Sequence, residues 1–240
     1  MQIFKTTTNL KRFLDTCRDN NKIISLVPTM GGLHDGHLKL VDRAKEISDI
    51  VVVSIFVNPT QFARGEDFDD YPNTFSSDQK QLESKGVSAL FFPSRDEIYP
   101  DGIQNDYKVG AIGQILCGAF RPTHFDGVAQ VVKRFFKIVE PDYAIFGEKD
   151  FQQLAIIKSL VERLNLDINI ESVGTQREKD GLAMSTRNQY LSSEDRKKAP
   201  NFYIQLNALK NSILDGSTVE SARLNAIERL NEEFETEYLE

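Results

Sequence analysis

Residues 28–38 read Pro28-Thr29-Met30-Gly31-Gly32-Leu33-His34-Asp35-Gly36-His37-Leu38, and the other predicted elements are arranged around this glycine-rich stretch. An apolar run of β type precedes it at 22–27, and apolar residues recur every three or four positions after it, from Leu38 to Ile47. This order predicts a strand, a tight turn and a helix start. Because the first amides of a helix lack partners within the helix and carry the positive end of its dipole, we expect this turn to bind an anion such as phosphate.

Two of the three histidines of the chain, His34 and His37, lie in this turn. If the helix begins near His34, their spacing places both rings on one face of its first turn. The residues alone leave three interpretations open, namely phosphate binding, helix capping and a metal site. The pair lacks the i, i+4 spacing and the intervening Glu of a zinc-protease helix, and no Cys is near. Residue chemistry therefore favours phosphate binding over capping, and both over a metal site.

The composition is that of an ordinary globular protein, with 240 residues and a net charge of −7. No apolar run approaches the roughly 20 residues that cross a bilayer, and the N-terminus has no signal or transit pattern, so we expect a cytoplasmic protein with no membrane partner. The two isolated cysteines, Cys17 and Cys117, suit a reducing compartment. Because Lys and Arg are not clustered, we expect no nucleic-acid partner.

Strand-like and helix-like patterns alternate between residues 20 and 173. We predict strands at 23–27, 50–57, 87–92, 143–146 and 168–173, and helices at 9–19 (after an Asn9 cap), 38–48, 76–85, 128–139 and 151–164. Residues 96–117 are predicted as loops with room for one short strand. The alternation predicts an α/β fold with a doubly wound parallel sheet.

The composition changes near residue 175, from β-branched residues to Lys, Glu, Asn and Leu. We therefore predict one domain at 1–175 and a small, mainly helical C-terminal domain at 176–240. Helices are predicted in it at 193–214 and 218–234, the first after a capping pattern formed by Ser192 and Asp195.

Polar side chains follow the ends of two predicted strands. Asn58 and Gln61 come after the strand at 50–57, and Lys149 follows the strand at 143–146. Because ligands of open α/β sheets bind outside the carboxyl ends of the strands, we expect these groups to share one edge. Lys149 and, in a later hydroxyl-rich loop, Arg187 are the cations that a phosphate chain needs besides the histidines.

Three neutral amides, Gln61, Gln152 and Gln153, suit a small substrate that bears hydroxyls and a carboxylate. For each of these residues alone, an ordinary role at a surface or helix start is the alternative. His124, which lies in a turn next to Pro122 and Thr123, is interpreted as a structural histidine.

Five blocks resemble, in order, the signature segments of the pantoate–β-alanine ligase (pantothenate synthetase) family. They occupy residues 28–38, 56–62, 121–128, 147–150 and 180–188. The His-x-Gly-His element alone is shared with the wider nucleotidylyltransferase superfamily, whereas the five blocks together are far more specific. Thr123 stands where this family commonly has Gly.

The resemblance implies a Rossmann-like nucleotidylyltransferase core, a homodimer and an AMP-forming ligase of pantothenate and coenzyme A biosynthesis. The implied reaction uses Mg²⁺ and ATP to convert pantoate into pantoyl adenylate with release of pyrophosphate. β-Alanine then attacks the adenylate and gives pantothenate and AMP. The family also continues beyond the point that corresponds to Glu240, so the C-terminal domain is expected to be incomplete.

The resemblance also implies roles for individual residues. His34, His37, Lys149 and Arg187 would be catalytic, with His37 in the position that the family assigns as proton donor. Gln61 and Gln153 would bind pantoate beside Asn58, and Gln61 would also lie near β-alanine. No residue is assigned to a resident metal. The expected ATP-binding residues are Met30, Gly31, Gly32, Leu33, His34, Asp35, Gly36, His37, Gly147, Glu148, Lys149, Asp150, Gln176, Met184, Ser185, Thr186 and Arg187.

Three alternatives stay open. An adenylyltransferase with another small acceptor would use the same phosphate seat, but a phosphate acceptor would need extra Arg or Lys near Gln61 and Gln153. A non-catalytic nucleotide-binding module would bind ATP without releasing pyrophosphate. A metallohydrolase built on the three histidines would depend on zinc.

Overall fold

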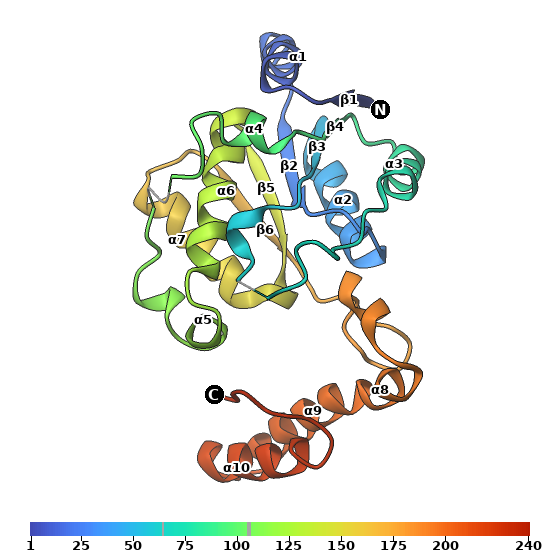
Figure 1. Cartoon of the computed structure of the whole chain (residues 1–240), viewed down its shortest axis with the longest axis vertical. Coiled ribbons are helices and arrows are strands. Elements are labelled where there is room, and N and C mark those ends of the chain that lie inside the picture. The colour runs from blue at the N-terminus through green and yellow to red at the C-terminus, as the bar shows by residue number, and fades with distance from the viewer. Residues whose placement is uncertain (64, 105–106) are drawn as a thin grey trace. The chain divides into compact units, whose positions relative to one another are not determined.

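The computed structural model describes residues 1–240 except 64 and 105–106, and it divides into two compact units, Met1–Thr175 and Gln176–Glu240. The first unit is built on one parallel sheet with the strand order β1-β4-β3-β2-β5-β6 (Figure 1). Its strands are β1 (Gln2–Phe4), β2 (Ile24–Thr29), β3 (Ile50–Ile55), β4 (Ala89–Phe91), β5 (Tyr143–Gly147) and β6 (Asn169–Val173).

Helices cover both faces of this sheet, which confirms the predicted doubly wound α/β fold. The α-helices are α1 (Thr7–Asp19), α2 (Asp35–Ile47), α3 (Phe75–Ser84), α4 (Arg95–Ile98), α5 (Cys117–Phe120), α6 (His124–Val139) and α7 (Phe151–Arg163). Apolar side chains of α1, α6 and α7 pack in the core on one face, and those of α2 and α3 pack in the core on the other.

The composition of β3 explains its central position in the sheet. β3 is almost entirely β-branched, and its residues from Val51 to Ile55 are buried, as a strand covered on both faces requires. It pairs in parallel with β2 over the whole of Ile24–Thr29. The carboxyl ends of β2 and β3 therefore lie next to each other, and the loops that follow them begin at the same edge of the sheet.

In the described part of the first unit, short 3₁₀ helices complete the connections. They are η1 (Pro59–Gln61) after β3, η2 (Ala111–Gly113) before α5, and η3 (Glu148–Asp150) between β5 and α7. Among the described residues of 96–117 the structure has helical turns and no strand, and Asn105 and Asp106 lie outside the described residues.

Several predicted boundaries differ from the structure. The edge strand β1 was not predicted, because three residues carry no readable alternation. Helix α1 begins before Asn9, because the Thr6 hydroxyl accepts a bond from the Asn9 amide and caps the helix. Helix α6 begins at His124 rather than at 128, since its first turn contributes only part of the apolar stripe.

The second unit is helical, with η4 (Thr186–Tyr190), α8 (Ser193–Lys198), α9 (Pro200–Leu214) and α10 (Val219–Leu230). Ser192 caps α8 by accepting a bond from the Asp195 amide, as its pattern predicts. The single helix predicted at 193–214 is two helices, because Pro200 is tolerated only at a helix start. No described helix is long and apolar enough to cross a membrane.

Candidate active site

The glycine-rich turn leaves β2 through backbone that only glycine adopts without strain. Gly31 and Gly32 have φ angles of +84° and +64°, in the left-handed region. The Thr29 hydroxyl fixes the start of the turn, since it donates to the Ser54 carbonyl at 2.7 Å and accepts from the Gly31 amide at 3.2 Å. The turn is thereby tied to β3 before the helix begins.

Asp78 of α3 holds the middle of the turn. Its carboxylate accepts bonds from the Gly32 amide at 3.0 Å and the Leu33 amide at 2.9 Å, and from the Thr74 hydroxyl at 3.1 Å. The side chain is buried, with 1% of its surface exposed. A buried carboxylate from another helix therefore occupies the amides of Gly32 and Leu33, which precede α2. An anion at this turn must meet groups that follow them in the chain.

His34 and His37 are those groups, and they also cap α2. The His34 ring accepts a bond from the Gly36 amide through Nδ1 at 3.1 Å, and the His37 ring accepts from the His34 amide through Nδ1 at 3.4 Å. The two ring centroids lie 4.1 Å apart. Because an acceptor nitrogen carries no proton, each neutral ring has its proton on Nε2. The capping interpretation is thus realised through Nδ1, and the Nε2–H groups stay available as donors.

Burial keeps both rings neutral. Burial is the main cause that lowers the pKa of His37 to about 3, and the repulsion that a protonated His37 would meet from a protonated His34 and from Lys149 lowers it further. Burial also lowers the pKa of His34, with Lys149 as the second cause. Lys149 of η3 is thus close enough to act on the pair, and it lies 3.7 Å from the Asp150 carboxylate. The site combines two neutral donors with one ammonium group.

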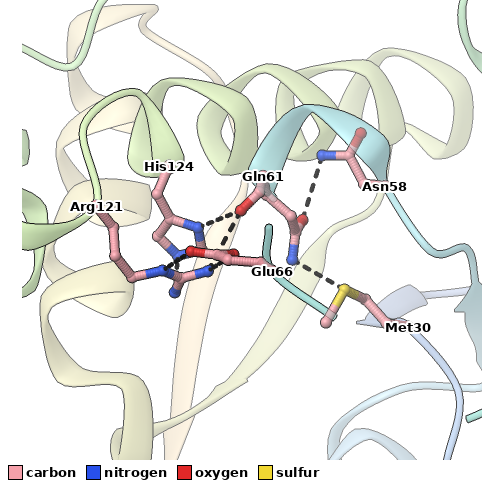
Figure 2. A network of polar contacts seen from close by, with 6 residues as sticks. All are labelled: Met30, Asn58, Gln61, Glu66, Arg121 and His124. Atoms are coloured by element: carbon pink, nitrogen blue, oxygen red, sulfur yellow. Dashed lines mark hydrogen bonds and ion pairs between the residues drawn. The ribbon is translucent and has the colours of Figure 1, made fainter. Parts of the chain in front are cut away.

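Asn58, Gln61 and Met30 form the next part of this edge (Figure 2). Asn58 is 1% exposed, and its amide orientation is fixed because Oδ1 accepts from the Thr60 amide at 3.4 Å while Nδ2 donates to the Gly127 carbonyl at 3.2 Å. Asn58 Nδ2 also donates to Gln61 Oε1 at 3.2 Å, so Gln61 Nε2 points toward Met30 Sδ at 2.9 Å. A thioether is a weak acceptor, so this NH₂ group retains donor capacity for a ligand.

Tyr99 completes the orientation of Asn58. Its hydroxyl donates to Asn58 Oδ1 at 2.8 Å from a buried position next to α4. Neither Tyr99 nor Asp78 is among the site residues predicted from the sequence. Each reaches the site from a distant segment and carries no motif, so only the three-dimensional structure reveals it.

The remaining predicted residues of the first unit lie around β5 and α7. Gly147 ends β5, Glu148 and Asp150 belong to η3, and Gln153 is half-buried in the first turn of α7. The neighbouring Gln152 has a structural contact, because its Nε2 donates to the carbonyls of Ile112 and Ile115 at 2.8 Å.

The predicted residues beyond 175 belong to the second unit. Gln176 and Met184 face each other across a hairpin, where the Met184 amide donates to the Gln176 carbonyl at 2.9 Å. Ser185 caps η4 by accepting from the Arg187 amide at 3.3 Å. Arg187 and Thr186 thus lie in the first turn of η4, directly after this hairpin.

A doubly wound sheet with His34, His37 and Lys149 after the carboxyl ends of its strands defines the class of an α/β enzyme that binds a nucleotide. The sequence matches the Pantoate-beta-alanine ligase family over residues 2–240. The chain therefore belongs to the pantoate–β-alanine ligase family, as its resemblance predicts.

Individual relatives agree with this assignment. A pantothenate synthetase of Vesicomyosocius okutanii is 47% identical over 240 residues, which is all of this chain and 85% of the relative. The crystal structure of pantothenate synthetase from Thermus thermophilus superposes with a TM-score of 0.91 at 42% identity, covering 97% of this chain and 83% of that one.

A third comparison bears on ligands. Pantoate-beta-alanine ligase from Francisella tularensis, complexed with beta-gamma ATP and beta-alanine, has a TM-score of 0.82 at 37% identity and covers 95% of this chain and 85% of its own. The family and its relatives thus confirm the predicted function as a pantoate–β-alanine ligase of pantothenate synthesis.

Proposed function

We propose that this chain activates pantoate as pantoyl adenylate at the carboxyl edge of its sheet, with His34, His37 and Lys149 as the groups that meet the phosphates. The observation that carries this proposal is the orientation of the histidine pair. Both Nδ1 atoms are engaged by backbone amides, so both Nε2–H groups are held as donors on one face of the first turn of α2.

In the first step, a carboxylate oxygen of pantoate attacks the α-phosphorus of ATP and the bond to the pyrophosphate oxygen breaks. Pantoate supplies its own nucleophile, so no Ser or Cys is needed. Negative charge grows on the α-phosphate and on pyrophosphate. Fixed Nε2–H donors and the Lys149 ammonium stabilise that charge more in the transition state than in the ground state. His37 then acts as a neutral hydrogen-bond donor, since its pKa of about 3 leaves it without the proton of an imidazolium.

Gln61 and Gln153 bind pantoate in this proposal, and Asn58 orients Gln61. The side-chain oxygen Oε1 of Gln61 already accepts a bond from Asn58, so the NH₂ group is the part of the side chain that faces a ligand. As a donor it suits a carboxylate or hydroxyl oxygen of pantoate. It lies 2.9 Å from the sulfur of Met30, next to the glycine-rich turn. This contact supports a pantoate position directly beside the proposed phosphate-binding residues His34 and His37.

The residues fit a Mg²⁺ ion that arrives with ATP. Among the described residues, no three or more His, Cys, Asp or Glu side chains gather as a metal cage. Mg²⁺ bound through phosphates keeps several waters and needs only one or two carboxylates. Asp150, whose side chain is 62% exposed beside Lys149, would supply one. When bound, the ion neutralises phosphate charge.

In the second step, the β-alanine amine attacks the acyl carbon of the adenylate and AMP leaves. The adenylate must be shielded from water until the amine arrives. We assign this shielding to Met184, Ser185, Thr186 and Arg187, with Arg187 also contacting phosphate and the Gln176 backbone facing adenine. The homodimer and the cytoplasmic location remain predictions, and light scattering of the purified chain tests the dimer.

The test is pyrophosphate release by the purified chain with Mg²⁺-ATP and pantoate, with and without β-alanine. We expect at most one equivalent of pyrophosphate without β-alanine, and continuous turnover to AMP and pantothenate with it. Turnover with a different acceptor in place of pantoate would indicate another adenylyltransferase. ATP binding without pyrophosphate release under any of these conditions would refute the catalytic proposal.

A further inference from the structure

η1, the short helix that carries Gln61, is weakly held by its own backbone. Its two i→i+3 bonds, from the Gln61 amide to Asn58 and from the Phe62 amide to Pro59, are both 3.4 Å long. Such a helix has few internal bonds to resist displacement. Contacts from outside must therefore fix the position of Gln61.

One short outside contact is made by His124, the first residue of α6. Its Nδ1 lies 2.6 Å from the main-chain carbonyl oxygen of Gln61 (Figure 2). A carbonyl oxygen only accepts, so Nδ1 carries the proton and donates. On the other side of the ring, Arg121 Nη1 lies 3.2 Å from Nε2. A guanidinium only donates, so Nε2 is the acceptor and the ring is neutral.

Glu66, from the loop that follows η1, holds Arg121 in place. The Arg121 guanidinium donates to both carboxylate oxygens of Glu66, from Nε at 2.8 Å and from Nη2 at 2.6 Å. The two side chains are only 29% and 24% exposed. A half-buried bidentate pair has defined geometry, unlike an exposed single-contact pair. These side-chain contacts form a series. Glu66 binds Arg121, Arg121 contacts His124, and His124 donates to the carbonyl of Gln61.

The two ends of Gln61 are therefore fixed by different groups. Asn58 orients the side-chain amide through Oε1, and His124 anchors the main-chain carbonyl, to which Arg121 Nη2 also donates at 3.4 Å. The amide group reaches its ligand from a backbone that the His124 bond keeps in place. If the carbonyl is released, η1 can rotate and the Nε2–H donors move away from their target.

We propose that His124, supported by the Arg121–Glu66 ion pair, is a positioning residue for pantoate binding that acts through Gln61. This inference rests on the proposed pantoate role of Gln61. It differs from the interpretation of His124 as a merely structural histidine, because it predicts a selective effect on one substrate.

The test uses His124→Phe, which keeps a ring but removes the donor, and His124→Asn, whose amide nitrogen can occupy the place of Nδ1. We expect His124→Phe to raise the KM for pantoate about tenfold, as the loss of one well-aligned hydrogen bond of about 1.4 kcal/mol would. The KM for ATP should stay unchanged. His124→Asn should restore the KM for pantoate to within about threefold of wild type.

Gln61→Ala and the double variant His124→Phe/Gln61→Ala separate the two proposals. If His124 acts through Gln61, the His124→Phe change should alter the KM for pantoate less than about twofold in the Gln61→Ala background. A full tenfold effect in that background would overturn the inference, as would equal losses for pantoate and ATP or no rescue by Asn. An unchanged KM for pantoate in Gln61→Ala alone would instead refute the proposed role of Gln61.

Arg121→Lys gives a second measure if His124→Phe fails to fold. Lys keeps the charge but loses the bidentate contact with Glu66. We expect a KM for pantoate about threefold above wild type and an unchanged KM for ATP. An Arg121→Lys enzyme that folds and has an unchanged KM for pantoate would show that the ion pair does not support His124.

Discussion

Gly127 of α6 offers a direct way to move Gln61 without changing any polar group. A Cβ atom at this position would lie 2.1 Å from the Thr60 carbonyl oxygen and 2.9 Å from the Gln61 amide nitrogen. Both neighbours are backbone atoms, so no side chain can move aside. In Gly127→Ala, η1 and α6 must therefore separate by about 1 Å or more to reach an ordinary contact distance.

A separation of this size has two expected effects. It lengthens the bond from Asn58 to the Gly127 carbonyl and the bond from His124 to the Gln61 carbonyl, since both join the η1 segment to α6. A misplacement of Gln61 by about 1 Å can reduce catalysis about 100-fold. The separation also strains the packing, which costs about 1–3 kcal/mol of stability. We therefore expect kcat/KM for pantoate to fall about 100-fold while the KM for ATP changes little.

The assay measures kcat/KM for each substrate at saturating levels of the others, together with the urea midpoint of unfolding. Leu10→Ala is the control, because Leu10 is fully buried in α1 and its truncation costs about 2–5 kcal/mol without touching η1. A Gly127→Ala enzyme with kcat/KM for pantoate within about threefold of wild type would refute the reasoning. The same selective loss in Leu10→Ala would attribute the effect to stability alone.

Four further outcomes follow from the site. His37→Ala and Lys149→Ala should each slow pantoyl adenylate formation about 100-fold, measured by pyrophosphate–ATP exchange. His37→Gln should lose less activity, because its amide can donate near the place of Nε2. Exchange at the wild-type rate in both alanine variants would remove the two residues from the mechanism. The pKa of His37 is lowered from 6.5 to about 3, so the contribution of the buried neutral ring to the free energy of unfolding is fully present above pH 6.5 and is lost as the pH falls toward 3. For the same reason, the pH profile of adenylate formation should show no limb due to this ring between about pH 8 and 6. A limb there that disappears in His37→Gln would contradict a neutral His37. Thr123→Gly should stabilise the fold by about 1 kcal/mol in urea, because Thr123 has a φ of +71°; an unchanged or lower urea midpoint would show that the fold absorbs this strain. EDTA should abolish pyrophosphate release and excess Mg²⁺ should restore it, whereas rescue by zinc alone would favour the metallohydrolase alternative.

Local patterns were enough to predict the sheet and most of its helices. The β-branched run of β3 and the apolar stripe of α7 each specify an element within one short window. The same windows could not reveal β1, whose pairing with β4 depends on residues far along the chain. The break at Pro200 was readable in principle, because Pro is excluded from helix interiors.

For the site, too, the sequence predicts some features and leaves others unpredicted. His34, His37, Lys149 and Gln61 follow strand ends, and strand ends can be read from the sequence. Their protonation and orientation could not be read, because these depend on partners that are distant in the sequence. Asp78 lies 46 residues from Gly32, and His124 lies 63 residues from Gln61. Thr123 illustrates the limit well, since the resemblance marks it as a departure from Gly and only the structure gives its left-handed backbone.

The opposite tautomers of the histidines make the chain its own spectroscopic probe. His34 and His37 carry the proton on Nε2, and His124 carries it on Nδ1, so ring ¹⁵N resonances fall into two recognisable patterns. With three histidines in 240 residues, every ring signal can be assigned by single substitutions. Titration with a nucleotide should perturb the first pattern and titration with pantoate the second, which lets one labelled sample report the order of substrate binding.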